Sequence, residues 1–349
     1  MKKIKYIVVL LLFFLVLVSC NSNNNRSVPK LANDSNPKII DLGNVLVWTT
    51  NDDQYEVFCD NTSIEENSTG IYFLPETIEN DSPYYVKNLR SGLTSNVINV
   101  KKNIFSDSEI LSIANSESYS GIISSTIKKI IVGSKEHYDE NVALSLVIDD
   151  RTDNLIVELN SVNVVGYIHS KNNNYKDSIY NIIIDNYGDS SIRSNDGRTG
   201  LDFSSSVYDD TESDAGAGIP AEDTLVNSKI VFIGSGNLGI YAGNGGNGGI
   251  GSGTTSESYK YPGRGSNGGD GGSAIKTSYL VVSSYDGSLN VKYKDGLGGQ
   301  KGLPGVNGSI FSGPLASMVW GNYDNGVNGN PGKSYFGTKY ILRGEFNAK

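Results

Sequence analysis

Cysteine and histidine are scarce in this chain, and their scarcity excludes several kinds of site. Only two residues of 349 are cysteine, Cys20 and Cys59, and Cys20 ends an N-terminal apolar run. Cys59 is then the one thiol of the folded part, so no intrachain disulfide is expected. The two histidines, His137 and His169, lie in different segments without cysteine partners. We therefore expect surface histidines, no metal site and no cofactor.

Basic residues are also in the minority. The chain has 29 Lys and Arg against 38 Asp and Glu, a formal net charge of −9. Binding to nucleic acid depends on clustered basic residues, and no basic run longer than two occurs outside the first residues. No nucleic-acid partner is expected, and the acidic balance favours solubility.

The first twenty residues have the pattern of an export signal. Basic residues come first, and the apolar run 7–18 is too short for a comfortable membrane span. The next residues, Leu17-Val18-Ser19-Cys20, resemble the lipobox of bacterial lipoproteins. This resemblance implies that residues 1–19 are a signal peptide, that Cys20 is lipidated, and that acyl chains hold the protein to a membrane of the cell envelope, on the outer surface. An ordinary secretory peptide with a chance cysteine is the alternative. Residues 20–36 are polar and predict a flexible tether.

Residues 37–101 alternate as half-buried strands do, with turn residues such as Asp60-Asn61 between the runs. The pattern predicts a β-sandwich. The run Val45-Leu46-Val47-Trp48, the run Tyr55-Glu56-Val57-Phe58, and Tyr85 followed by Gly92 and Val97 resemble the fibronectin type III family. The family's Leu-x-Pro-x-Thr-x-Tyr corner is not evident, and no Arg-Gly-Asp tripeptide occurs. The resemblance implies a spacer, or else a ligand-binding module.

Residues 104–223 predict a second β-rich region, with repeated Ile- and Val-rich runs. The exception is 104–114, whose spacing predicts a helix capped by Ser106 and Glu109. A weak repeat also occurs, in which a strand, a turn and a short strand are followed by a polar or Gly-rich excursion. The segment 146–150 is echoed by 182–186, and Ile192, Ile240 and Val291 lie about fifty residues apart. Such repetition predicts stacked units that bury each other's apolar faces.

Residues 224–349 carry many of the chain's 41 glycines, often three residues apart, as in 296, 299, 302, 305 and 308. A period of three is that of the polyproline II helix, and glycine at every third position lets such helices pack closely. A flexible linker is the alternative, but strand-like runs and aromatic residues interrupt the tract. The tract resembles glycine-rich repeat regions of bacterial surface proteins and phage tip adhesins. The expected fold class is all-β: a fibronectin-III-like sandwich, then a repetitive β region with polyproline-II-like glycine segments.

Three groups of residues are candidates for chemistry or binding. Asp210, Glu212 and Asp214 place oxygen ligands at alternate positions, as a calcium loop does, although a solvated acidic loop fits as well. Asp149-Asp150 and Asp209-Asp210 are candidate acid–base pairs for glycoside hydrolysis, although adjacent aspartates are also common in turns. Tyr259, Tyr261 and Tyr323 stand among glycines, where they either stack on sugars or partner side chains or seal the glycine packing.

These patterns favour a membrane-anchored, non-catalytic surface lipoprotein that acts in adhesion or extracellular interaction, with a glycan or a protein as ligand. Two alternatives stay open. One is an enzyme that degrades polysaccharide on a β-helix scaffold, and the other is a purely structural envelope protein.

Overall fold

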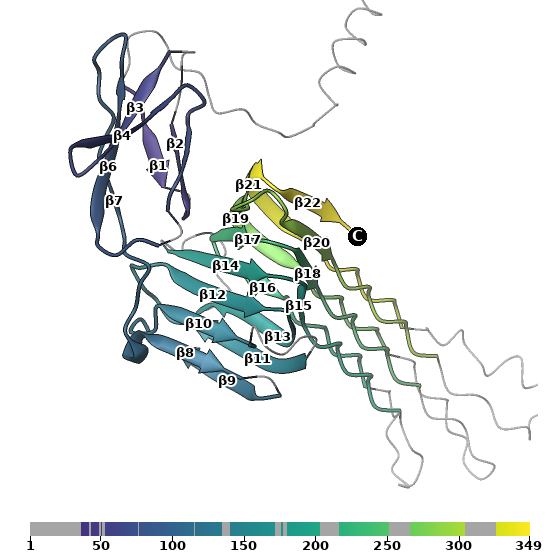
Figure 1. Cartoon of the computed structure of the whole chain (residues 1–349). Coiled ribbons are helices and arrows are strands. Elements are labelled where there is room, and N and C mark those ends of the chain that lie inside the picture. The colour runs from purple at the N-terminus through teal and green to yellow at the C-terminus, as the bar shows by residue number, and fades with distance from the viewer. Residues whose placement is uncertain are drawn as a thin grey trace, which may run out of the picture.

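The computed structural model describes residues 36–41, 43–48, 50, 53–75, 77–114, 116–134, 140–171, 176, 180–202, 216–250, 266–303 and 326–349. Over these residues the protein is all-β, as predicted, and no α-helix occurs in them. A small sandwich comes first, then a stack of parallel strands from which extended segments project (Figure 1). Cys20 and the predicted signal peptide, residues 1–19, lie outside the described residues, so both assignments stay predictions.

Two antiparallel sheets face each other in the N-terminal part. One has the order β1-β2-β5 and the other β4-β3-β6-β7. The strands are β1 (Ile39–Asp41), β2 (Val45–Trp48), β3 (Tyr55–Cys59), β4 (Thr62–Asn67), β5 (Ile71–Phe73), β6 (Ser82–Asn88) and β7 (Ile98–Val100). Trp48 and Tyr55, one from each sheet, meet edge to face at 6.1 Å in the shared core. The β3–β4 turn is Asp60-Asn61, both at positive φ (48° and 63°), as a two-residue hairpin requires.

The rest of the chain coils into a solenoid, in which two ladders of parallel strands face each other. The first ladder is β8 (Ile110–Ile113), β10 (Lys129–Val132), β12 (Leu155–Asn160), β14 (Asn181–Tyr187), β17 (Lys229–Gly234), β19 (Ile275–Ser283) and β21 (Tyr335–Arg343). The second is β9 (Ser118–Ile123), β11 (Glu140–Ile148), β13 (Val162–Ser170), β15 (Ser190–Arg193), β18 (Asn237–Tyr241), β20 (Asn290–Lys294) and β22 (Glu345–Ala348). The short β16 (Leu225–Val226) bridges β13 and β19. One continuous sheet thus crosses the predicted boundary at 223/224.

Alternation of side chains builds the solenoid core. On β11, Val142, Leu144, Leu146 and Ile148 are at most 1% exposed, and the side chains between them face outward. Equivalent apolar positions on neighbouring strands stack in register, so each coil covers the apolar face of the next. A single coil would leave that face in water, and the stack is therefore what makes the fold stable.

Two sequence predictions for this region are wrong. Segment 104–114 holds only a 3₁₀ turn, η1 (Asp107–Glu109), before β8. Ser106 does form the capping box with Glu109, but parallel pairing of β8 with β10 extends the backbone directly afterwards. The segments 146–150 and 182–186 are not equivalent either, because they begin in β11 and β14, on opposite ladders.

The sandwich is docked on the outer face of the first ladder. All four residues of β2 are buried. Leu46 and Trp48 face the sandwich core, whereas Val45 and Val47 pack on the solenoid. Their partners on that face are Ile183, Val231, Ile233 and Val281. Asn44 adds a buried hydrogen bond, donating from Nδ2 to the carbonyl of Ser283 at 3.0 Å. Sandwich and solenoid therefore share an apolar interface.

Candidate functional site

Three pairs of extended legs project from the solenoid, on the side away from the sandwich (Figure 1). The outgoing legs are residues 194–202, 242–250 and 295–303, and they follow β15, β18 and β20. The returning legs are residues 216–223, 266–274 and 326–334. A leg of nine residues with a polyproline II rise of about 3.1 Å per residue is about 28 Å long.

Backbone hydrogen bonds between legs replace a sheet ladder. The outgoing leg 242–250 is bonded to four other legs. Gly246 N donates to Ile219 O at 3.0 Å, Gly269 N donates to Gly246 O at 2.7 Å, and Gly248 N donates to Gln300 O at 2.8 Å. Donors recur every third residue, the period expected of polyproline II helices. The described legs are therefore a packed bundle.

Glycine is required here because the backbones touch. A Cβ on Gly246 would lie 1.9 Å from the carbonyl oxygen of Arg198, and one on Gly299 would lie 1.9 Å from that of Gly246. No real Cβ contact is that short, and the obstacle is backbone, which cannot rotate away. The triplet spacing in the sequence thus marks the faces that meet.

Asparagine and aspartate side chains complete the bundle on its outer faces. Each accepts a hydrogen bond from a backbone N of the following leg pair: Asp196 from Asn244, Asp202 from Ile250, Asn244 from Leu297, Asn247 from Gln300, Asn267 from Val327 and Asp270 from Asn330, at 2.7–2.9 Å. Amide groups that would otherwise face solvent are satisfied in this way. We call this set of hydrogen bonds the side-chain ladder. It joins the first leg pair to the second and the second pair to the third.

All three leg pairs end on the same side of the bundle. The connecting segments are 203–215, 251–265 and 304–325, which lie outside the described residues. These segments contain the candidate calcium ligands Asp210, Glu212 and Asp214, the candidate ligand-binding residues Tyr259, Tyr261 and Tyr323, and Asp209. Their proposed roles stay predictions.

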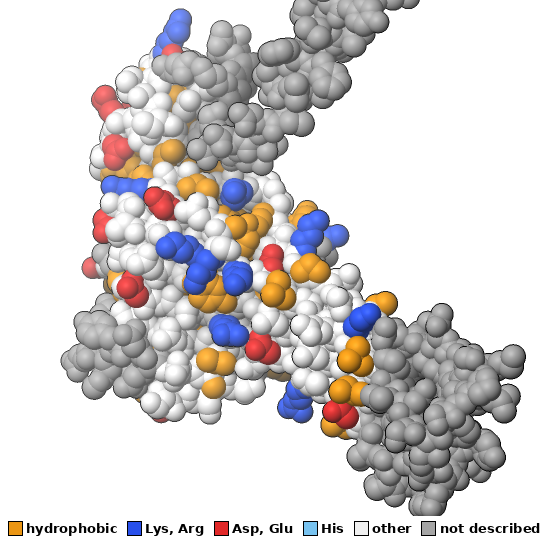
Figure 2. Space-filling view, turned by 90° about the vertical axis from the view of Figure 1, so that its right-hand side faces the viewer, with side chains coloured by type: hydrophobic (Ala, Val, Ile, Leu, Met, Phe, Trp, Pro, Cys, Tyr) orange, Lys and Arg blue, Asp and Glu red, His pale blue; other side chains and the backbone are white. Residues whose placement is uncertain are grey.

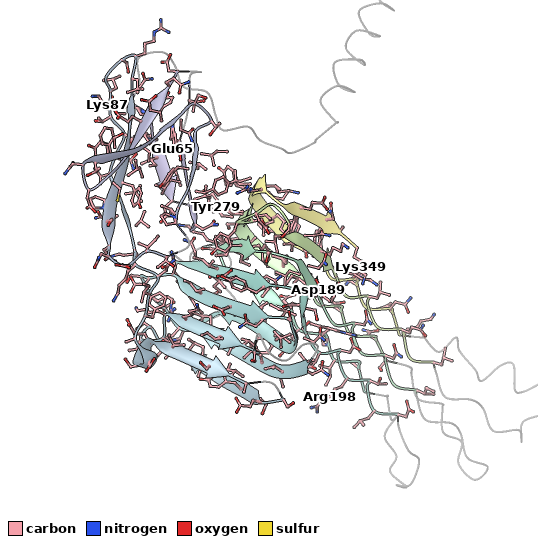
Figure 3. The ribbon with its side chains drawn as sticks, viewed as in Figure 1. Glu65, Lys87, Asp189, Arg198, Tyr279 and Lys349 are labelled. Carbon is pink, nitrogen blue, oxygen red and sulfur yellow. The ribbon has the colours of Figure 1, made fainter. Side chains whose placement is uncertain are left out.

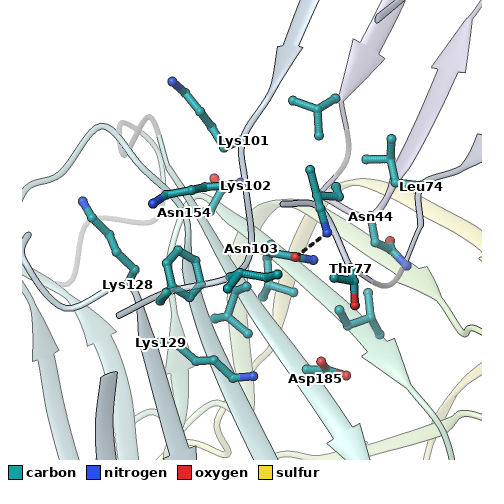
Figure 4. Close-up of a pocket in the computed structure, with 18 of the residues that line it drawn as sticks. Asn44, Leu74, Thr77, Lys101, Lys102, Asn103, Lys128, Lys129, Asn154 and Asp185 are labelled. Carbon is teal, nitrogen blue, oxygen red and sulfur yellow. Dashed lines mark hydrogen bonds between the residues drawn. The ribbon is translucent and has the colours of Figure 1, made fainter. Parts of the chain in front are cut away.

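A cleft of about 610 Å³ lies between the sandwich and the solenoid (Figure 4). Lys101 and Lys102 line it from the sandwich side, and Lys128 and Lys129 from the solenoid side. Acidic partners hold most of these charges, because Lys101 contacts Asp81 at 2.8 Å, Lys128 contacts Asp153 at 2.6 Å and Lys129 contacts Glu158 at 2.6 Å. Sequence reasoning missed this cleft. The sequence feature that could have indicated it is the two Lys-Lys pairs, which are the only ones after residue 20.

Asp41 also lines this cleft. Burial raises the pKa of its carboxyl to about 6, although the backbone N of Gly43 donates to it at 2.7 Å and Lys229 lies close enough to lower the pKa. Desolvation outweighs both partners, since a buried carboxylate loses its hydration. The cleft therefore holds a carboxyl whose pKa is raised by burial.

The candidate catalytic pair Asp149-Asp150 follows β11. Asp149 accepts a hydrogen bond from Lys171 at 2.8 Å, and this contact, with the backbone N of Asp150, lowers the pKa of Asp149. A general acid in glycoside hydrolysis needs a raised pKa, so Asp149 does not suit that role. The second candidate pair, Asp209-Asp210, lies outside the described residues.

From the sequence, the two histidines were expected at the surface and Cys59 was expected to form no intrachain disulfide. His169, predicted at the surface, is 7% exposed, stacks on Tyr167 at 4.3 Å and lies 2.7 Å from the carbonyl of Asp223 through Nε2. This prediction was wrong because the chain returning from the first leg pair covers that position. His137 lies outside the described residues. Cys59 is a free, half-buried thiol.

The described residues contain no cluster of three or more candidate metal ligands. They also contain no helix that is long and apolar enough to cross a membrane. Comparison of the chain with protein-family models, with curated proteins and with solved structures gave no match.

Proposed function

We propose that this protein is a bacterial lipoprotein, anchored through Cys20 on the outer surface of the cell, which acts in adhesion or another extracellular interaction without catalysis. The observation that carries the proposal is the leg bundle. It is a scaffold of backbone hydrogen bonds that extends about 28 Å from the solenoid and holds three connecting segments at one end. Binding residues on loops that a scaffold positions are a common arrangement in proteins.

The position of the sandwich supports the same reading. It follows the predicted tether and lies on the side of the solenoid away from the legs (Figure 1). Its two facing antiparallel sheets, β1-β2-β5 and β4-β3-β6-β7, support the proposal of a fibronectin-III-like sandwich. We propose that this domain is a spacer, because the solenoid covers the outer face of its β1-β2-β5 sheet.

The anchoring is tested on cells that produce the wild type, Cys20→Ala or Cys59→Ala. We expect the wild type and Cys59→Ala in the membrane fraction and open to protease added to intact cells. Cys20→Ala is expected in the soluble fraction, since it lacks the acylated thiol. Cys59→Ala is the matched control. A wild-type protein that protease cannot reach in intact cells would contradict surface display.

The adhesive role is tested by replacing residues 251–265 with a short Gly-Ser linker. We expect lower attachment of cells to surfaces coated with glycans or host proteins, with unchanged circular dichroism of the purified variant. If cells that lack the whole protein attach as well as the wild type does, the structural alternative is favoured.

A further inference from the structure

The C-terminal part of this acidic chain carries a local excess of basic side chains. Residues 224–349 contain eleven Lys and Arg but six Asp and Glu. On the face seen in Figure 2, basic side chains gather between the sandwich and the legs. Lys292 and Lys294 on β20 and Lys349 after β22 are exposed, and no carboxylate of a described residue forms an ion pair with them. These three ammonium groups are therefore available to an external anion.

Strand register brings the basic side chains together on the outer face of the second ladder. Arg193, Tyr241 and Lys294 are aligned across β15, β18 and β20, and Lys349 follows Ala348, the partner of Tyr293. Neighbouring strands are about 4.8 Å apart, so the positions repeat at that spacing. Lys349 Nζ also lies 4.8 Å from the centre of the Tyr241 ring, a cation–π contact that orients the ammonium group.

A groove of about 270 Å³ lies beside this row, and we call it the amide groove. It is lined by Asn163, Asp189, Ser190, Asn237, Leu238, Gly239, Tyr241, Asn290, Lys292 and Lys349. The ring of Tyr241 occupies the space that a Cβ on residue 239 would need, so glycine at this position lets the ring lie against the groove. Figure 3 shows Asp189 and Lys349 at the junction of the solenoid and the legs. The groove thus combines amides, one carboxylate and two ammonium groups.

The polar groups of the amide groove are held in place by one another. Asp189 Oδ1 accepts hydrogen bonds from the backbone N of Asn237 at 3.2 Å and from its Nδ2 at 2.9 Å. Asn290 Nδ2 donates to Asn237 Oδ1 at 3.4 Å. No described residue donates to the second oxygen of Asp189, so it can accept a hydrogen bond from a ligand.

We propose that the amide groove binds an anionic polysaccharide whose charge is a carboxylate or a sulfate ester. The ammonium groups of Lys292, Lys294 and Lys349 bind the anions, and Asp189 and the amides bind sugar hydroxyls. Sugar hydroxyls can donate hydrogen bonds to Asp189, whereas the ionised phosphates of a nucleic-acid backbone only accept them. A ligand with a regular repeat also suits groups that recur from strand to strand. The inference rests on the proposed adhesive function and names a ligand class for it.

The test uses the purified full-length chain and three hexasaccharides on one backbone: unsulfated chondroitin, chondroitin sulfate and the methyl ester of the unsulfated form. Calorimetric titration is expected to show binding of the two charged forms and at least tenfold weaker binding of the neutral ester. Lys292→Gln/Lys294→Gln should bind the charged forms about tenfold more weakly. The matched control, Lys87→Gln/Lys102→Gln on the sandwich and linker, should bind as the wild type does. Equal affinity for the two charged forms would identify the carboxylate as the anion that is bound, and tighter binding of the sulfated form would show that the sulfate ester contributes.

Two results would overturn the inference. One is unchanged affinity of Lys292→Gln/Lys294→Gln for both charged hexasaccharides, with its circular dichroism unaltered. The other is equal affinity for a single-stranded oligonucleotide of the same charge, which would show a non-specific basic surface. Neither result would change the outcome of the protease and cell-attachment experiments. Failure of this inference can therefore be told apart from failure of the proposed adhesive function.

Discussion

The solenoid and the leg bundle are two ways of packing the same chain. In the solenoid, side chains fill the space between the ladders: Leu146, Leu155 and Phe232 are all 0% exposed. In the bundle the backbones meet directly at the contact glycines, and at Gly246 and Gly299 a carbonyl oxygen of a neighbouring leg lies 1.9 Å from where a Cβ would be. Burial of apolar surface stabilises the first. Hydrogen bonds and close backbone contact stabilise the second.

This difference matters for how each region tolerates change. An apolar core accepts other apolar residues of similar volume. The bundle has no such alternatives at its contact positions, because anything beyond a hydrogen atom is too large. The two regions also depend on each other, since β15, β18 and β20 lead directly into the outgoing legs.

The largest effect is expected for Phe232→Ala in the solenoid. Phe232 lies 6.4 Å from Phe346 between ring centres, and its loss leaves a cavity that costs about 3–5 kcal/mol. Urea unfolding followed by hydrogen exchange should show that leg amides lose protection together with the solenoid. Tyr279→Ala, at a 44% exposed side chain, is the control. Legs that stay protected after the solenoid unfolds would show that the two regions are independent.

A smaller loss of stability is expected for Gly246→Ala in the bundle. The added methyl group forces the backbones apart and should lower the free energy of unfolding of the bundle by about 3 kcal/mol. Exchange of the amides of Gly269 and Gly248 should quicken, while the solenoid keeps its protection. Gly121→Ala on β9 is the matched control, since the nearest atom to its Cβ would be 3.7 Å away. An equal effect at both glycines would contradict the close-contact account.

The smallest effect is expected for Asn247→Ala. This change removes the acceptor of the Gln300 amide on the outer face of the bundle and should cost about 1 kcal/mol. The Gln300 amide should exchange about fivefold faster. Asn347→Ala, whose amide makes one exposed 3.4 Å contact with Glu345, should leave stability unchanged. If the Gln300 exchange rate does not move, the side-chain ladder has no stabilising role.

Local signals in the sequence predicted local structure well. Asp60-Asn61 is the turn that its residue types require, and the triplet glycines mark contact faces. The 104–114 prediction was wrong because apolar spacing there suits a helix as well as a strand, and only the later β10 decides between them. Which leg packs on which could not be predicted, since one glycine triplet is like another.

Sites made from distant residues could not be predicted either. The run Val45 to Trp48 predicted a half-buried strand. The structure buries both of its faces, because Val45 and Val47 pack on residues of the first ladder that lie more than 130 positions away. The amide groove brings together Asn163, Asp189 and Lys292, which share no motif. Strand register, which sets these neighbours, depends on the whole stack rather than on any one segment.

The close backbone contact in the legs has a consequence for how this gene can vary. Every missense change of a glycine codon introduces a larger side chain, so nearly all missense changes at the contact glycines are expected to be harmful. The leg positions between them are under no such steric restriction. Inherited variation in the described legs should therefore collect between the contact glycines.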